Sequence, residues 1–344
     1  MTLKTRRLLF MAVCLVPGLA MFMLFKLYPT IQVFYKSFYL WTGIGDKPKF
    51  IGFKNFVDMF RDDAFLLSLR NTGFLMVIVP VFTLLIALVN ASILTRTKLK
   101  ERGLYRTLFF FPSILSFVVI AILWSFIYHP TLGFLNSGLE LTGLGQYAMP
   151  WLGDSRTVLW ALAVTMIWQA AGYYMVIYMA GIDGISPDLY EAASIDGATP
   201  MKQFIHITIP MLWEIIRITI IFSINGVLSI SFVIVTIMTA GGPDRHSEVV
   251  MTYLYQQAFT NSNFGYAMAI GVFVFAFFRA PVADQQQTYG KGFLLIWHKF
   301  RQARRFLPQG NVGRRKRLSS SATGSSGSCS SFRRWRSRIR CCGT

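Results

Sequence analysis

The sequence predicts an all-α membrane protein with about six membrane-spanning helices. Of its 344 residues, 54% are hydrophobic and only 14% are charged, whereas soluble domains carry about 25% charged residues. The apolar residues gather in runs of about 20, the length that a helix needs to cross a bilayer core of about 30 Å. Short basic segments border several of these runs, as expected at the cytoplasmic ends of membrane helices.

Five apolar runs are long enough to span a bilayer: Leu8 to Phe25, Thr72 to Leu94, Leu108 to Tyr128, Val158 to Ile182 and Ile218 to Met238. A sixth run, Phe264 to Phe278, would rise only about 22 Å as a helix and would end inside the hydrocarbon with unpaired carbonyl groups. The first run resembles a signal peptide at Lys4 to Ala20, but it continues to Phe25, which favours a retained helix.

The chain divides by charge at residue 278. Arg279 to Thr344 holds 15 of the 34 basic residues and one of the 15 acidic residues, so residues 1–278 carry a net charge of only +5. The basic residues of that part lie at membrane borders, before the first helix and between Arg96 and Arg106, which places both segments and the N-terminus in the cytoplasm. The basic pI therefore indicates contact with membrane lipid and gives no support for a nucleic-acid partner.

Residues 279–344 differ in composition from the transmembrane domain of residues 1–278. They are rich in serine and arginine and contain Cys329, Cys341 and Cys342. The segment is interpreted either as a disordered cytoplasmic extension that touches anionic lipid or as a translation in a shifted reading frame that begins near Arg279, and we favour the second. The cysteine spacing indicates neither a disulfide framework nor a metal site.

The polar segment 183–213 is longer than a simple connection between two membrane helices requires. Ser186, Pro187 and Asp188 form a strong helix start, with a hydroxyl N-cap, proline at the first position and an acid in the first turn. We therefore expect a short helix from Pro187 to about Ile195. The apolar face expected for this helix comprises Leu189, Ala192, Ala193 and Ile195.

A turn and a second helix are expected to follow. Gly197 permits the turn, and Thr199 with Pro200 repeats the helix-start signal, which predicts a helix from Pro200 to His206. Pro210 marks the entry to the next membrane helix. By alternation from the N-terminus this helix–turn–helix faces the cytoplasm, either as an interfacial amphipathic connector or as a surface for another protein.

The same segment resembles the EAA loop of permease subunits of binding-protein-dependent ABC importers. The residues that carry the resemblance are Glu191, Ala192, Ala193, Gly197, Ile207 and Pro210. The family usually has leucine before the proline, where this sequence has Ile209. The resemblance implies that the segment is a coupling loop that sits on an ATPase, and the residues assigned to it are Glu191, Ala192, Ala193, Asp196, Gly197, Ile207 and Pro210.

Residues 17–278 are similar more widely to the carbohydrate-type permeases of the maltose and glycerol-phosphate transporter group. The matching stretches are PGLAMFMLFKLYPTIQVFYKSFYLW at 17–41, FIGFKNFVDMF at 50–60, RNTGFLM at 70–76, RGLYRTLFFFPSIL at 102–115 and TAGGPDRHSE at 239–248. The resemblance implies the ABC type I importer permease fold in a bacterial or archaeal cytoplasmic membrane. It further implies a heterodimer with a second permease, two ATPase subunits and an external sugar-binding protein.

The energy source is expected on a separate chain. The phosphate-binding pattern GxxxxGK followed by Ser or Thr is absent, so ATP and Mg are expected on the partner ATPase and no cofactor on this chain. A secondary transporter or channel is the alternative, but such proteins carry ionisable residues at mid-membrane, and the five spans have almost none. A membrane enzyme is disfavoured because the four histidines are scattered along the sequence.

Polar residues in the fourth and fifth apolar runs are the candidates for the substrate path. They are Gln169, Tyr173, Tyr174, Asn225, Ser229 and Ser231. Amide and hydroxyl groups can hydrogen-bond a sugar, and the family resemblance implies that these two helices line the passage. The competing interpretation, which we favour for any single residue, is hydrogen bonding between neighbouring helices at about 0.6 kcal/mol each.

Overall fold

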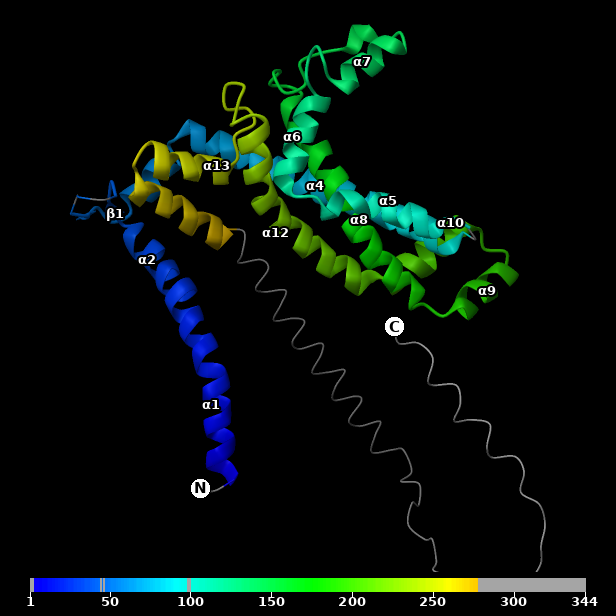
Figure 1. Ribbon diagram of the computed structural model, residues 1–344, viewed down its shortest axis with the longest axis horizontal. Helices are drawn as coiled ribbons and strands as arrows, with labels where there is room; N and C mark the ends of the chain where they lie inside the picture. Colours follow the sequence, from blue (N-terminus) through cyan, green and yellow to red (C-terminus); the bar gives the residue numbers. More distant parts are fainter. Residues whose placement is uncertain (1–2, 44, 46, 98–99, 278–344) are drawn as a thin grey trace, which may run out of the picture. The chain divides into compact units, whose positions relative to one another are not determined.

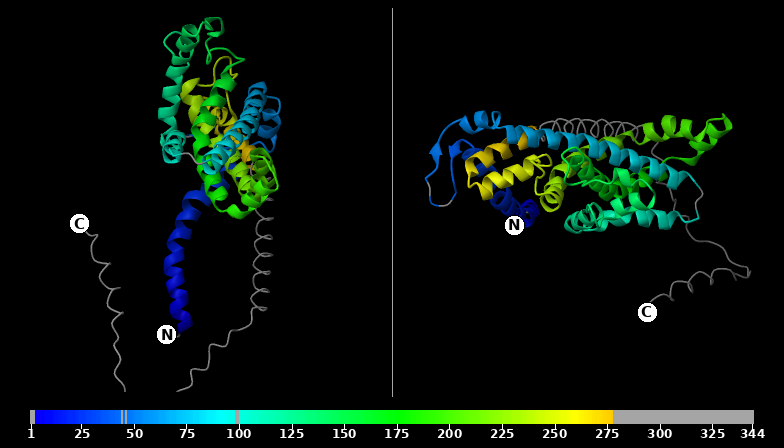
Figure 2. Two further views of the ribbon diagram at one scale, coloured as in Figure 1. Left: turned by 90° about the vertical axis from the view of Figure 1, so that its right-hand side faces the viewer. Right: turned by 90° about the horizontal axis from the view of Figure 1, so that it is seen from above.

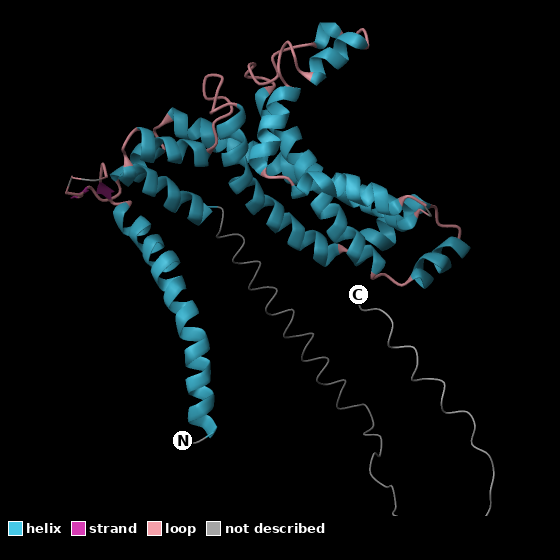
Figure 3. Cartoon of the chain, viewed as in Figure 1, coloured by secondary structure: helices cyan, strands magenta, loops and turns pink. Residues whose placement is uncertain are grey.

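The computed structural model describes residues 3–43, 45, 47–97 and 100–277, which are predominantly helical (Figures 1 and 3). The α-helices of this part are α1 (Leu3–Phe22), α2 (Tyr28–Lys36), α3 (Lys54–Met59), α4 (Asp63–Arg96), α5 (Arg102–Ile114), α6 (Phe117–Ile127), α7 (Phe134–Leu141), α8 (Val158–Asp183), α9 (Pro187–Ile195), α10 (Pro200–Gln203), α11 (Ile209–Met211), α12 (Trp213–Met238) and α13 (Val250–Tyr255). A further helix covers Phe264–Phe277. The strands β1 (Tyr39–Leu40) and β2 (Lys49–Phe50) pair antiparallel. The predicted all-α class is confirmed.

Four helical stretches of the described chain are long and apolar enough to cross a membrane: Phe10–Lys36, α4, α8 and α12. The fourth predicted run matches α8 to within one residue. The first, second and fifth runs were predicted too short, although the fifth ends at Met238 as expected. The first stretch continues to Lys36 instead of ending at Phe25, and α4 begins at Asp63 instead of Thr72. The side chain of Asp62 explains the early start of α4, because it accepts hydrogen bonds from the backbone N–H groups of Ala64 and Phe65.

The third predicted span is broken, so the expectation of one continuous helix from Leu108 to Tyr128 was wrong. Helices α5 and α6 are bent by 101° relative to each other, and Leu115 and Ser116 between them have extended backbones. Tight packing holds α5 along α8: a Cβ atom on Gly172 would lie 1.8 Å from the carbonyl oxygen of Phe109. Helix α6 instead packs mainly on α12, so the chain must turn between the two.

Two π-helical segments precede prolines. Met23–Leu27 leads into α2 with Pro29, and Phe204–Thr208 leads into α11 with Pro210. Proline has no N–H, and its ring crowds the carbonyl four residues earlier, so the preceding turn widens. The predicted helix from Pro200 to His206 is therefore α10 followed by a π turn. Pro210 lies in α11, three residues before α12 begins.

Three hydrophobic clusters hold the described helices together. The first joins α4, α6, α8 and α12 around Leu75, Ile120, Leu162 and Ile234. The second joins α4 and α8, which run alongside each other (Figure 2), and includes Tyr178 and Leu212. The third packs the start of α4 against α13 and the Phe264–Phe277 helix. These clusters fix α8 and α12, the two helices that flank the polar segment 183–213.

Candidate functional site

Segment 183–213 folds into the helix–turn–helix that its sequence predicts, and we refer to it as the α9–α10 loop (Figure 1). Its first helix, α9, has the predicted bounds Pro187–Ile195. The predicted hydroxyl cap is not formed: the Oγ of Ser186 donates a hydrogen bond of 3.1 Å to Oδ2 of Asp188 instead of accepting from the backbone. The bond from the hydroxyl to a charged carboxylate is stronger than a neutral cap bond, so it sets the orientation of the Ser186 side chain.

Gly197 ends α9 in a backbone conformation that favours glycine. Its φ of +75° is left-handed, its N–H donates to the carbonyl of Ser194 at 3.1 Å, and the N–H of Ala198 donates to the carbonyl of Ala193 at 2.9 Å. These two bonds form a Schellman motif. No heavy atom lies within 4 Å of a Cβ built on Gly197, so the constraint there is the backbone angle rather than space.

The face by which α9 attaches is not the predicted one. Tyr190 is the buried residue of the helix, whereas Leu189 and Ile195 are 46% and 87% exposed. A single large aromatic side chain outweighs several small apolar ones in contact area, so it sets the orientation of the helix. Glu191 and Asp196 are consequently exposed.

The remaining residues assigned to the loop differ in their exposure to solvent. Ala192 and Pro210 are exposed, and Ala193 and Ile207 are half-buried. The loop has two arms: α9 is the first, and residues 199–208, which comprise α10 and the π turn, are the second. In the second arm, Oγ1 of Thr199 accepts from the N–H of Lys202 as predicted for a cap, at 3.4 Å. The two arms are joined by a hydrogen bond of 3.0 Å between the hydroxyl groups of Tyr190 and Thr208.

Two arginines of the basic segment between α4 and α5 contact this region. The guanidinium carbon of Arg96 lies 3.3 Å from the ring centroid of Tyr190, and its Nη2 donates to Oε1 of Gln203 at 3.4 Å. Arg102 forms an ion pair with Asp183, at the end of α8, at 3.1 Å. Sequence reasoning treated these arginines only as markers of orientation, and a lone arginine near a helix end carries no signal for a specific contact.

Of the six substrate-path candidates, Tyr173 and Tyr174 contact each other through their rings, with 5.2 Å between the centroids. Gln169, Tyr174 and Ser231 are buried, Asn225 is half-buried, and Tyr173 and Ser229 are exposed. Asn225 and Ser231 donate to carbonyls of their own helix. Two side-chain hydrogen bonds between helices were missed by sequence reasoning: Oγ of Ser113 in α5 donates to the carbonyl of Gln169 in α8 at 2.9 Å, and the hydroxyl groups of Tyr178 in α8 and Thr219 in α12 lie 2.7 Å apart. The six residues stay a prediction.

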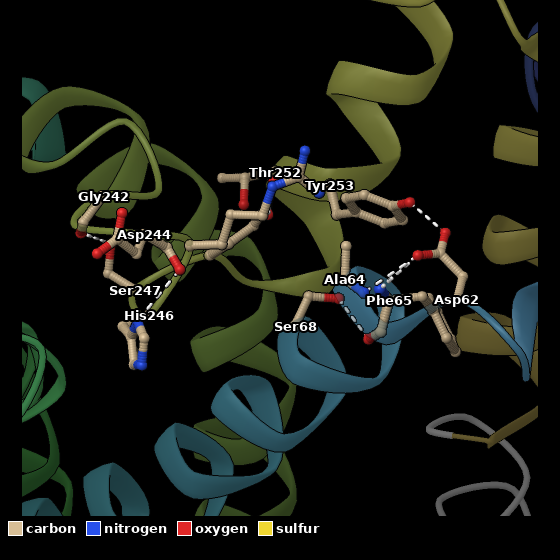
Figure 4. Close-up of polar contacts among 12 residues, drawn as sticks. Asp62, Ala64, Phe65, Ser68, Gly242, Asp244, His246, Ser247, Thr252 and Tyr253 are labelled. Atoms are coloured by element: carbon tan, nitrogen blue, oxygen red, sulfur yellow. Dashed lines mark hydrogen bonds and ion pairs between the residues drawn. The ribbon is translucent and has the colours of Figure 1, made fainter.

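A second polar cluster lies at the other end of α4, around Asp62 (Figure 4). Its Oδ2 accepts hydrogen bonds from the hydroxyl groups of Tyr253 and Tyr266. Burial favours the neutral acid, but these bonds and those from the backbone outweigh it and lower the pKa of Asp62. Burial and the adjacent carboxylate raise the pKa of Tyr253. Asp62 is therefore a charged anchor between α4, α13 and the Phe264–Phe277 helix.

The segment 239–248 beside this cluster is a compact turn with unusual backbone angles. Ala240, Asp244 and Arg245 have positive φ values of 47°, 43° and 62°, and Oγ of Ser247 donates to the carbonyl of Gly242 (Figure 4). At its base Glu248 is only 5% exposed. Burial raises the pKa of Glu248, with Arg245 opposing the rise and Asp62 adding to it.

The fold defines a multi-pass membrane protein of the importer-permease type. One structure with a similar fold is the crystal structure of a bacterial ABC transporter involved in the import of the acidic polysaccharide alginate. A chain of that transporter superposes on 88% of this chain, and on 98% of its own length, with a TM-score of 0.70 and 23% sequence identity. The chain belongs to the family described as "Binding-protein-dependent transport system inner membrane component", whose model matches residues 59–282.

Two relatives illustrate the family resemblance at higher identity. The "Probable ABC transporter permease protein YurN" of Bacillus subtilis is 37% identical over 76% of this chain and 89% of its own length. The "Diacetylchitobiose uptake system permease protein NgcF" of Streptomyces coelicolor is 34% identical over 74% of each chain. The family resemblance inferred from segment 183–213 and residues 17–278 is thereby confirmed, and the secondary-transporter alternative is set aside.

Proposed function

We propose that this chain is the permease subunit of an ATP-driven sugar importer, and that its α9–α10 loop docks on a separate ATPase. The observation that carries the proposal is the folded α9–α10 loop, which exposes Glu191 and Asp196 while Tyr190 ties it to the bundle. ATP binding and its Mg belong to the partner. Closure of the ATPase would push the loop and reorient the membrane helices between inward-facing and outward-facing states.

The named relatives support the proposed partners and the proposed solute class. Those that are at least 31% identical include permeases of diacetylchitobiose uptake and lactose transport systems. A structure with the same fold is a transporter in complex with a periplasmic protein that carries an alginate pentasaccharide. We accordingly propose a second permease, two ATPases and an external sugar-binding protein as partners.

We also propose that the six polar residues of α8 and α12 line the sugar path. A Gln169→Leu variant that took up the sugar at an unchanged rate would show that Gln169 is not part of this path.

The test is co-purification of the ATPase with a loop variant. In Gly197→Asp a side chain must adopt the left-handed φ of +75° at the turn of the loop, which distorts the proposed docking surface. We expect membrane insertion to persist, and the ATPase recovered with the permease to fall at least about fivefold, which corresponds to about 1 kcal/mol of lost affinity.

Gly143→Asp is a matched control. Gly143 ends α7 with φ +76°, a Cβ there also meets no heavy atom within 4 Å, and the same pair of backbone hydrogen bonds closes the helix. The two substitutions therefore carry similar local strain at different surfaces. Equal recovery of the ATPase with both variants would count against the docking role of the α9–α10 loop.

A further inference from the structure

Arg96, the last residue of α4, contacts both arms of the α9–α10 loop. Its guanidinium group stacks on the ring of Tyr190 in α9, with 3.3 Å between the guanidinium carbon and the ring centroid. The same group donates to Gln203 in α10 at 3.4 Å. Gln203 in turn donates to Oγ of Ser194 at 2.9 Å and to the carbonyl of Ala198 at 3.2 Å. One side chain of α4 thus touches a network that closes the loop on itself.

The residues that Arg96 touches are fixed parts of the loop. Tyr190 is 3% exposed and Gln203 is 9% exposed, whereas the surface proposed to meet the ATPase, at Glu191 and Asp196, is exposed. Arg96 therefore contacts the side of the loop that faces the bundle. A force applied to the exposed side would reach Arg96 through Tyr190 and Gln203.

Helix α4 can carry such a displacement across the molecule. It has 34 residues, a length of about 51 Å. Near its other end the side-chain amide of Asn71 donates to the carbonyl of Glu248 at 2.9 Å, and Oγ1 of Thr72 accepts from the N–H of Val250 at 2.9 Å. The loop at one end and segment 248–250 at the other are therefore bonded to the same helix.

We propose that Arg96 is a positioning residue that makes α4 move together with the α9–α10 loop during the transport cycle. This inference rests on the proposed function, because the ATPase supplies the movement of the loop. Arginine suits the position, since its planar guanidinium group stacks on an aromatic ring and forms a directed hydrogen bond at the same time, which a lysine ammonium cannot do.

The experiment measures whether α4 and the loop keep their separation when the ATPase closes. The importer is assembled from all its subunits, with Cys14, Cys329, Cys341 and Cys342 of this chain replaced by serine. Spin labels are attached at Val89→Cys in α4 and Met201→Cys in α10, which are 45% and 65% exposed. Double electron–electron resonance then compares the nucleotide-free complex with the complex trapped by Mg, ADP and vanadate.

With Arg96 in place we expect the label distance to change by less than ~2 Å between the two states, and in Arg96→Ala we expect a larger shift, approaching the ~5.4 Å of a one-turn helix displacement. Arg96→Lys should behave like Arg96→Ala, because it keeps the charge but not the stacking. Tyr190→Phe, which keeps the ring, should behave like the unmodified chain. The matched control is Arg102→Ala, which removes an arginine paired with Asp183, the last residue of α8, and leaves the contacts to α9 and α10 intact.

Three results would overturn the inference: a shift in the unmodified complex, the absence of a shift in Arg96→Ala, or loss of the ATPase from the Arg96→Ala complex. The last would make Arg96 part of the docking surface instead of a link to α4. Failure of the proposed function has a different signature, since the ATPase would then fail to co-purify with the unmodified permease.

Discussion

Glu248 illustrates how one buried residue sets a dependence on pH. Its raised pKa means that the folded protein binds this proton more tightly than the unfolded chain does. The stability that Glu248 contributes is thus present below its unfolded pKa of about 4.3 and is lost as the pH rises through its folded value. Asp62, with a lowered pKa, acts in the opposite sense, and its contribution is lost as the pH falls below about 3.9.

Ionisation of Glu248 lowers the stability of the folded state as the pH rises above about 4.3, and we expect this decrease to be absent in Glu248→Gln. Its Oε2 is buried without a hydrogen bond and lies 3.9 Å from Nε of Arg245, so neutralising the group should stabilise the folded state more at pH 8 than at pH 5. Thermal unfolding between pH 5 and pH 8 measures this, with the exposed Glu140→Gln as the control. An unchanged pH slope in Glu248→Gln would assign the dependence to another group.

At the scale of elements, the contact between α5 and α8 depends on the absence of a side chain at Gly172. A methyl group there would lie 1.8 Å from the carbonyl oxygen of Phe109, so Gly172→Ala must push the two helices apart. We expect a loss of about 1–3 kcal/mol of stability, the usual cost of overpacking, seen as a lower unfolding temperature.

Gly138 in α7 provides the comparison for that prediction. It is also helical, but no heavy atom lies within 4 Å of a Cβ built on it. Gly138→Ala should therefore be neutral, or stabilising by up to about 1 kcal/mol through helix propensity. If both alanine variants unfolded at the same temperature, the close approach of α5 to α8 at Gly172 would not determine the stability of the protein.

The elements that sequence reasoning placed well are those with local signals. Helix α9 has a proline at its start and a glycine at its end, and its bounds agree with the prediction. The break between α5 and α6 has only a weak signal: Pro112 lies inside α5, three residues before the extended Leu115, and a proline in an apolar run can kink a helix without ending it. Hydropathy reports how long an apolar run is, and does not report whether its backbone stays helical.

For the molecule as a whole, the orientation in the membrane follows from charge. The basic segment between α4 and α5 is expected in the cytoplasm with the α9–α10 loop, which makes residues 129–157 external. With the native cysteines replaced, we expect a membrane-impermeant maleimide to label Glu140→Cys in intact spheroplasts. Lys100→Cys should react only after permeabilisation, and the reverse pattern would invert the proposed orientation.

The candidate site shows the same division between local and distant information. Glu191 to Gly197 could be located from sequence because spacing and capping residues identify the loop. Arg96, Tyr190 and Gln203 could not be linked, since they come from segments about one hundred residues apart and meet only when α4 packs on α8. The tail of residues 279–344 lies outside the described residues, and resequencing the DNA near Phe278 remains the test of its reading frame.

The interruption between α5 and α6 has a consequence for the surroundings of this chain. The break lies about 20 Å along the rise from the start of α5, and Ser116 there is exposed. Lipid tails offer no hydrogen bonds, so extended backbone at that depth requires either another polypeptide or water against it. The surface around Ser116 is therefore unsuited to face hydrocarbon, and we expect it to lie against either a partner chain or a water-filled passage.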